Sequence, residues 1–80
     1  MFEIIEDTIE TTADTRKRLS NKTDKELFKI LIEADRDIQN GRHFASTYQE
    51  WSVGTDILRQ RGYGYLSPKD IVELYNAKWR

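Results

Sequence analysis

The stretch 23–41, TDKELFKILIEADRDIQNG, holds the strongest helix signal in the chain. Thr23 followed by Glu26 predicts a capping box, in which each side chain accepts the backbone N–H of the other residue. The apolar residues that follow recur at steps of three and four and cover a broad face; they are Leu27, Phe28, Ile30, Leu31, Ala34 and Ile38. The Asn-Gly pair at the end is typical of a left-handed helix stop. The pattern predicts a helix over 24–40 that supplies most of the core.

The segments on either side are also expected to be helical. Residues 3–19 carry a thin apolar stripe at helical spacing, in a threonine-rich stretch of low helix propensity. Residues 43–61 carry a stripe of aromatic and apolar residues. Ser46 and Gln49 form a possible second capping box, which favours a start at Thr47. Gly54 costs about 1 kcal/mol in a helix interior, so we expect a bend or break there.

The last predicted helix covers 68–78. Ser67 is a good N-cap, and Pro68 suits the first helical position because its missing N–H has no partner there. Asp70 places an acid near the positive end of the helix. No strand alternation or internal repeat occurs, so the chain is predicted to be an all-α, single-domain bundle of about four helices spanning 1–80.

The composition limits the chemistry that the chain can carry. A chain of 80 residues forms one domain with a small core. It has no cysteine and one histidine, His43, which excludes disulfides and the usual zinc clusters. We expect no metal and no cofactor. Self-association or a partner is one way for so short a chain to gain stability.

The amino terminus and the hydropathy pattern indicate a cytosolic location. MFEIIEDTIE is acidic where an export signal is basic and then apolar. No run approaches the 18 or so apolar residues of a membrane span, so we expect no direct membrane insertion. Residues 1–15 hold five acids and no base, whereas residues 16–29 hold six bases and two acids. This separation of charge favours docking to a charged protein.

Enzymatic activity finds little support. His43 and Ser46 are three residues apart, but no third group is spaced to orient them as a catalytic pair. Asp35 and Asp37 are two residues apart and do not face each other on a helix. The sequence GYGY lacks the Lys-Ser/Thr of a phosphate-binding loop. We therefore predict that the protein is not an enzyme.

Protein binding has the better physical case. Aromatic residues gather in the last eighteen positions, and Tyr, Trp and Arg are the usual anchors of interfaces. The candidate partner-binding residues are Arg59, Arg61, Tyr63, Tyr65, Tyr75 and Trp79. The competing interpretation is that the tryptophans and Tyr75 fill the core, whereas the loop position of Tyr63 and Tyr65 favours exposure.

Nucleic-acid binding is the alternative function. The helices predicted over 43–61 and 68–78 could form a helix-turn-helix, with Arg59 and Arg61 before the second helix and Lys69, Lys78 and Arg80 on it. Against it, the formal net charge is −1 and the last helix is apolar on one face. Nucleic acid is therefore the less favoured partner.

The run TDKELFKILIEADRDIQNGRHFASTYQEWSVGTDILRQRGYGYLSP resembles the RIII lysis-inhibition accessory proteins of the T-even bacteriophages. The resemblance covers most of the chain and contributes least in the first twenty residues. It implies an antiholin-type regulator in the host cytoplasm that delays lysis by acting on the cytoplasmic segment of the phage holin. Such a regulator reaches the inner face of the membrane only through its partner. The resemblance assigns no binding residues.

Overall fold

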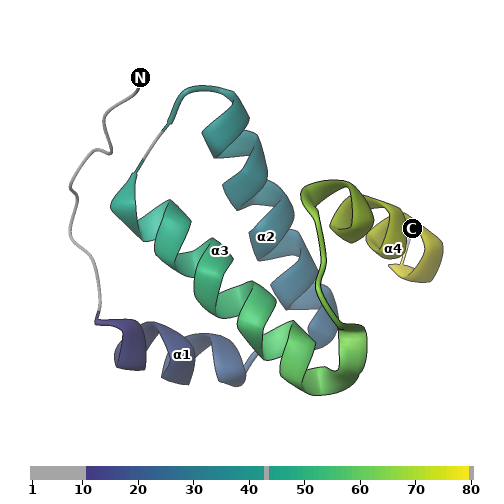
Figure 1. Cartoon of the computed structure of the whole chain (residues 1–80), viewed down its shortest axis with the longest axis horizontal. Coiled ribbons are helices and arrows are strands. Elements are labelled where there is room, and N and C mark those ends of the chain that lie inside the picture. Colours follow the sequence, from purple (N-terminus) through teal and green to yellow (C-terminus); the bar gives the residue numbers. More distant parts are fainter. Residues whose placement is uncertain (1–10, 43, 80) are drawn as a thin grey trace.

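The computed structural model describes residues 11–42 and 44–79, and the chain folds as a small all-α domain, as the sequence predicts (Figure 1). The elements are α1 (Thr12–Ser20), α2 (Asp24–Gln39), α3 (Ala45–Leu58), the wide helical turn η1 (Arg59–Tyr63) and α4 (Pro68–Trp79).

Both ends of α2 form as the sequence predicts. The Thr23 hydroxyl accepts the Glu26 N–H at 3.2 Å, and the Glu26 carboxylate accepts the Thr23 N–H at 3.1 Å. At the other end Gly41 adopts φ +81°, which only glycine does without strain. Its N–H and that of the next residue donate to last-turn carbonyls at 3.1 and 2.8 Å, so the helix closes after Gln39.

The start of α1 differs from the prediction. A single helix over 3–19 is wrong, because Thr11 has extended backbone angles (φ −64°, ψ 160°) and its hydroxyl accepts the Asp14 N–H at 3.1 Å. A threonine that caps in this way begins a helix. The first helical residue is therefore Thr12, and positions 3–10 of the prediction lie outside the described residues.

The bend or break expected at Gly54 is wrong. Helix α3 runs unbroken through this glycine, which lies in the contact with α2. A Cβ there would lie 2.8 Å from Cδ2 of Leu31, so glycine is present to let the two helices approach.

The predicted capping box at the start of α3 is also wrong. The helix begins at Ala45 behind Phe44, which makes no side-chain cap. Gln49 donates instead to the Thr15 hydroxyl at 2.6 Å and ties α3 to α1. At its far end the helix widens into η1 and stops at Gly62, which has φ +101°.

The helix α4 begins as predicted. Ser67 and Asp70 exchange hydrogen bonds between side chain and backbone N–H at 3.1 and 3.2 Å. The helix continues to Trp79, one residue beyond the predicted end.

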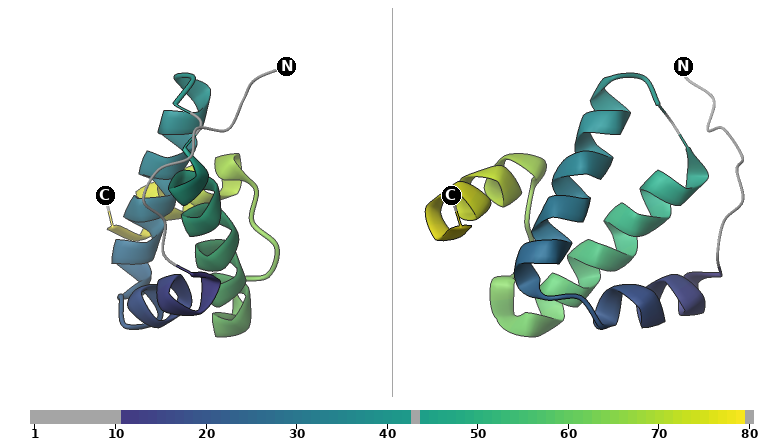
Figure 2. Two further views of the ribbon diagram at one scale, coloured as in Figure 1. Left: turned by 90° about the vertical axis from the view of Figure 1, so that its left-hand side faces the viewer. Right: turned by 180° about the vertical axis from the view of Figure 1, so that it is seen from behind.

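The helices pack in a row in the order α1, α3, α2, α4. Helix α3 contacts α1 on one side and α2 on the other, and α4 packs on α2 away from α3 (Figures 1 and 2). The fully enclosed core comes from every helix, most of all α2; it contains Leu19, Leu27, Phe28, Leu31, Val53, Ile57, Leu58 and Ile71. Two residues of the predicted stripe of α2, Ile30 and Ile38, are only half-buried. None of the helices in the described ranges is long and apolar enough to span a membrane.

Candidate functional site

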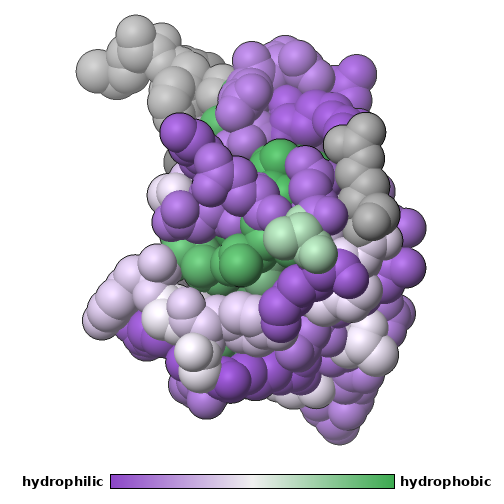
Figure 3. Space-filling view, turned by 90° about the vertical axis from the view of Figure 1, so that its right-hand side faces the viewer, coloured by the Kyte–Doolittle hydropathy of each residue, from purple (hydrophilic) through white to green (hydrophobic). Residues whose placement is uncertain are grey.

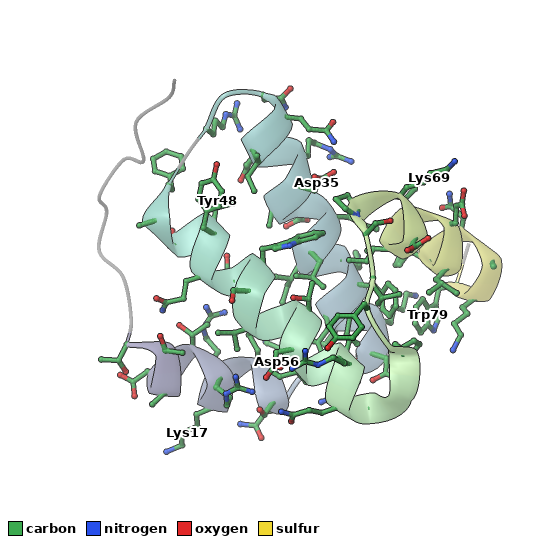
Figure 4. All side chains as sticks on the ribbon, in the orientation of Figure 1. Lys17, Asp35, Tyr48, Asp56, Lys69 and Trp79 are labelled. Carbon is green, nitrogen blue, oxygen red and sulfur yellow. The ribbon has the colours of Figure 1, made fainter. Side chains whose placement is uncertain are left out.

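The six residues that the sequence singled out do not form one patch. Two of them fasten the η1 turn to α2, two lie on the face of α4 that packs on α2, and two border a cleft beside α1 and α3. In Figure 4 Trp79 and Asp56 mark the α4 region and the α1–α3 region respectively.

Arg61 and Tyr63 are both bonded to Asp24. The Arg61 guanidinium lies 2.7 Å from the Asp24 carboxylate and also donates to the Ser20 carbonyl at 3.1 Å. The Tyr63 hydroxyl donates to the same carboxylate at 2.7 Å, and its ring meets Phe28 edge-on with 5.3 Å between centroids. Tyr63 is half-buried, so the exposure expected from its loop position is wrong.

The Asp24 contacts join three elements. The hydrogen bond from the Tyr63 hydroxyl, and to a lesser extent the one from Arg61, holds the pKa of the Asp24 carboxyl below its ordinary value. Lys78 on α4 donates to the Tyr63 hydroxyl at 3.2 Å and lies 4.9 Å from the centre of its ring. This network therefore fastens both η1 and α4 to the first turn of α2.

Tyr75 and Trp79 are half-buried and pack against the core. The Trp79 ring lies 5.2 Å from that of Phe28, and Tyr75 lies 5.8 Å from Trp79. Each ring also has an edge on the surface, because both residues line a hollow between α2 and α4. Each ring therefore lies partly in the core and partly on the surface, so both the core interpretation and the interface interpretation apply to it.

A groove runs along the seam between α2 and α4, and it is called the α2–α4 groove below. Its central part has a volume of about 420 Å³ and is lined by Ile32, Arg36, Val72, Tyr75, Asn76 and Trp79. Adjoining hollows share some of these residues and extend it toward Lys29 and toward Ser67. Figure 3 views the side of the molecule on which α4 lies and shows an apolar area within a largely hydrophilic surface.

The charges along the groove come mainly from α2. Lys29, Glu33 and Arg36 line it, and none of the three makes an ion pair within residues 11–42 and 44–79. On the α4 side Lys69 and Glu73 pair at 3.9 Å. Asp35 also lines the hollow toward Ser67, so the whole groove has three bases and three acids, whereas the central hollow has one charged lining residue, Arg36.

Four residues of the central groove were not among the candidates from the sequence: Ile32, Arg36, Val72 and Asn76. Val72 is 39% exposed although it is apolar, and Ile32 lies outside the main apolar stripe of α2. The sequence signal that could have revealed the groove was Ile32, an apolar residue of α2 that does not belong to the predicted core face.

Arg59 and Tyr65 lie away from this groove. Tyr65 is 86% exposed, and the Arg59 guanidinium lies 5.1 Å from the centre of its ring. The same guanidinium pairs with Asp56. Both residues border a separate cleft with α1 and α3.

The carboxylates considered for catalysis have separate partners. Asp35 accepts a hydrogen bond from Gln39 at 2.8 Å, and Asp37 lies 3.5 Å from Arg42. His43 lies outside the described residues, so its pairing with Ser46 stays untested. Within the described ranges, no cluster of three His, Cys, Asp or Glu side chains could hold a metal ion.

The basic residues proposed for nucleic-acid binding are mostly engaged. Arg59 pairs with Asp56, Arg61 with Asp24, and Lys78 with the Tyr63 hydroxyl. Arg80 lies outside the described residues. Moreover, α4 packs on α2 rather than on α3, whereas the predicted helix-turn-helix needs those two helices as a unit. This alternative stays a prediction with less support than protein binding.

Comparisons of the chain with protein-family models, with curated proteins and with solved structures gave no match. The resemblance to the RIII proteins therefore stays a prediction, and the proposal below depends on the α2–α4 groove.

Proposed function

We propose that the protein is a non-enzymatic regulator that binds an amphipathic helix of another protein in the α2–α4 groove. The observation that carries the proposal is the apolar seam itself, in which the exposed Val72 lines the same hollow as the half-buried Ile32, Tyr75 and Trp79. Exposed apolar surface framed by polar residues is typical of interaction sites.

The spacing of the lining residues suits a helical partner. On α4 they fall at positions 72, 75, 76 and 79, and on α2 at 29, 32, 33 and 36. Both sets follow the i, i+3, i+4, i+7 pattern of a single helix face. Two such faces side by side form the walls of a groove in which a third helix can place its apolar stripe.

The charge of the groove indicates which helix fits. In the central hollow and the hollow toward Lys29, Lys29 and Arg36 outnumber Glu33, so a partner helix with a carboxylate beside its apolar stripe is favoured at that end of the groove. Arg36 is the best placed of them because it lines the central hollow.

The partner that the resemblance implies is the cytoplasmic segment of a phage holin. In that role the protein acts in the host cytoplasm and reaches the inner face of the membrane through the holin. Binding to the inactive state of the holin and antiholin stabilises that state by mass action, without covalent chemistry. Lysis is thereby delayed.

The test is calorimetric titration of the full chain with a synthetic peptide of the holin cytoplasmic segment. We expect binding that weakens about tenfold in Val72→Ser and in Arg36→Gln, the loss of about 1.4 kcal/mol. Lys17→Gln is the matched control, because it removes an exposed base on α1 outside the groove. Thermal melts establish that each variant folds.

Unchanged binding in both groove variants would remove the α2–α4 groove from the proposal. Absence of any binding by the unchanged protein would remove the holin segment as its partner. A doubling of the mass in light scattering, lost in Val72→Ser, would identify a second copy of the chain as the occupant instead.

A further inference from the structure

A second hollow lies between α1, α3 and the segment that leads to α4. It has a volume of about 480 Å³ and is called the Tyr65 cleft; it is lined by Thr12, Arg16, Trp51, Ser52, Val53, Thr55, Asp56, Arg59, Gly64, Tyr65 and Leu66. It shares no lining residue with the α2–α4 groove. Its volume is within the range of about 300–1,000 Å³ found for ligand sites.

The charged residues that line the cleft are two arginines and one aspartate. Asp56 accepts from Arg16 at 2.8 Å and also pairs with Arg59. The hydrogen bond from Arg16, together with the charge of both arginines, lowers the pKa of the Asp56 carboxyl. The carboxylate is therefore ionised at neutral pH, and the cleft keeps one positive charge in excess.

The two guanidinium groups retain the capacity to bind a further anion. The Arg16 and Arg59 side chains are 41% and 43% exposed, and each guanidinium has five N–H donors. Arg16 joins α1 to α3 through Asp56, and the Arg18–Glu50 ion pair and the Gln49–Thr15 hydrogen bond join the same helices, so the α1–α3 contact does not need Arg59. Arg59 is the first residue of η1, and it pairs with Asp56, which lies three residues earlier near the end of α3.

Aromatic and apolar side chains surround this charge. Trp51 and Leu66 are half-buried with a surface on the cleft, and Tyr65 stands exposed at its border under the Arg59 guanidinium. Tyr, Trp and Arg are the residue types that anchor most protein interfaces. The Tyr65 ring makes no contribution to the core cluster, so packing within the domain does not explain it.

We propose that the Tyr65 cleft is a second docking site, for a short acidic segment of a partner protein. A Glu or Asp side chain of that segment binds between Arg16 and Arg59, and the neighbouring apolar side chain packs on Trp51 and Leu66. Charge complementarity selects this occupant over a neutral or basic segment. The proposal is independent of the function assigned to the α2–α4 groove.

The two tryptophans of the chain allow the test to separate the sites, because Trp51 lines the Tyr65 cleft and Trp79 lines the α2–α4 groove. The ¹⁵N-labelled full chain is titrated with a capped Gly-Leu-Glu-Leu-Gly peptide while the two indole N–H signals are followed. We expect the Trp51 signal to shift at millimolar peptide and the Trp79 signal to stay. The matched peptide with Gln in place of Glu should bind at least about tenfold more weakly.

Variants locate the contact within the cleft. Tyr65→Ala and Arg59→Gln should each weaken the Glu peptide severalfold, whereas Lys17→Gln, on the same helix as Arg16 but outside the cleft, should not. The exposure of Tyr65 makes its truncation safe for folding. Equal binding of the Glu and Gln peptides, no shift of Trp51, or full binding by Tyr65→Ala and Arg59→Gln would each overturn the proposal.

Discussion

Tyr63 and Tyr65 lie two residues apart, yet Tyr63 is half-buried against the core and Tyr65 is exposed. Tyr63 follows Gly62 at φ +101°, and Tyr65 follows Gly64 at φ +76°. These two backbone angles turn the chain so that the Tyr63 hydroxyl reaches Asp24, whereas the Tyr65 ring lies under Arg59. The difference between the two tyrosines is therefore set by glycine conformations that place them on different elements.

Asp24 should make the stability of the protein sensitive to acid. Folding lowers the pKa of its carboxyl, so the unfolded chain holds the proton more tightly. The stabilisation is complete above about pH 4, the unfolded value, and is lost as the pH falls through the lower folded pKa. At neutral pH we expect Asp24→Asn to cost about 1 kcal/mol of unfolding free energy, a value reduced for the partial exposure of the pair.

The measurement is thermal unfolding by circular dichroism at several pH values. The difference between Asp24→Asn and the unchanged protein should be largest near pH 7 and should shrink below about pH 3. Glu33→Gln is the control, since Glu33 is an exposed acid on the same helix and makes no ion pair within the described ranges. A difference that stays constant with pH would contradict the role given to the Asp24 carboxylate.

Helix α2 is the element on which α3, α4 and η1 converge. Leu31 meets Gly54 of α3, and Phe28 meets Tyr63 and Trp79 from the far side. The groove side of the same helix carries Ile32 and its charged neighbours. An apolar stripe this broad predicts a central helix, but the assignment of each face to a neighbour depends on the packing.

Gly54→Ala should destabilise the protein, although alanine is the better helix former. The gain in propensity is about 1 kcal/mol, whereas forcing a Cβ to 2.8 Å from the buried Leu31 side chain costs about 1–3 kcal/mol. We expect a net loss of about 1 kcal/mol in chemical denaturation.

A double-mutant cycle distinguishes this clash from a general loss of helix stability. Leu31→Ala alone should cost about 2–5 kcal/mol. In that background Gly54→Ala should become neutral or stabilising, because the methyl group then has room. Effects that add to within about 0.5 kcal/mol would show that the two residues do not interact.

At the scale of the whole molecule, α4 occupies one end of the row of helices. It packs on α2, and Ile71 is its one buried residue among those described, whereas four residues of α2 are buried. The contacts that hold it are the aromatic cluster around Phe28 and the polar network around Asp24. The helix with the fewest buried contacts is expected to open most easily.

Native-state hydrogen exchange should therefore distinguish α4 from the rest of the molecule. We expect amides of α4 to exchange at least about tenfold faster than those in the middle of α2 and α3, because α4 can open without disturbing the α1–α3 contact. Binding of a helical peptide in the α2–α4 groove should slow exchange in α4 selectively. Equal protection of α4 and α2 in the free protein would mean that the four helices open as one unit.

The sequence by itself determined the helical class, the capping box and glycine stop of α2, and the Ser67–Asp70 start of α4, because caps and periodic apolar faces are local properties of the chain. It did not reveal that Gly54 is a contact point, that Tyr63 is bonded to Asp24, or that Ile32 and Val72 share a groove. These facts join residues that are 23 to 40 positions apart, and only the packing of α3 and α4 on α2 brings them together. The sequence therefore predicted which types of residue line the candidate site but not which individual residues do so. The reason is that interfaces and cores are anchored by the same aromatic residue types.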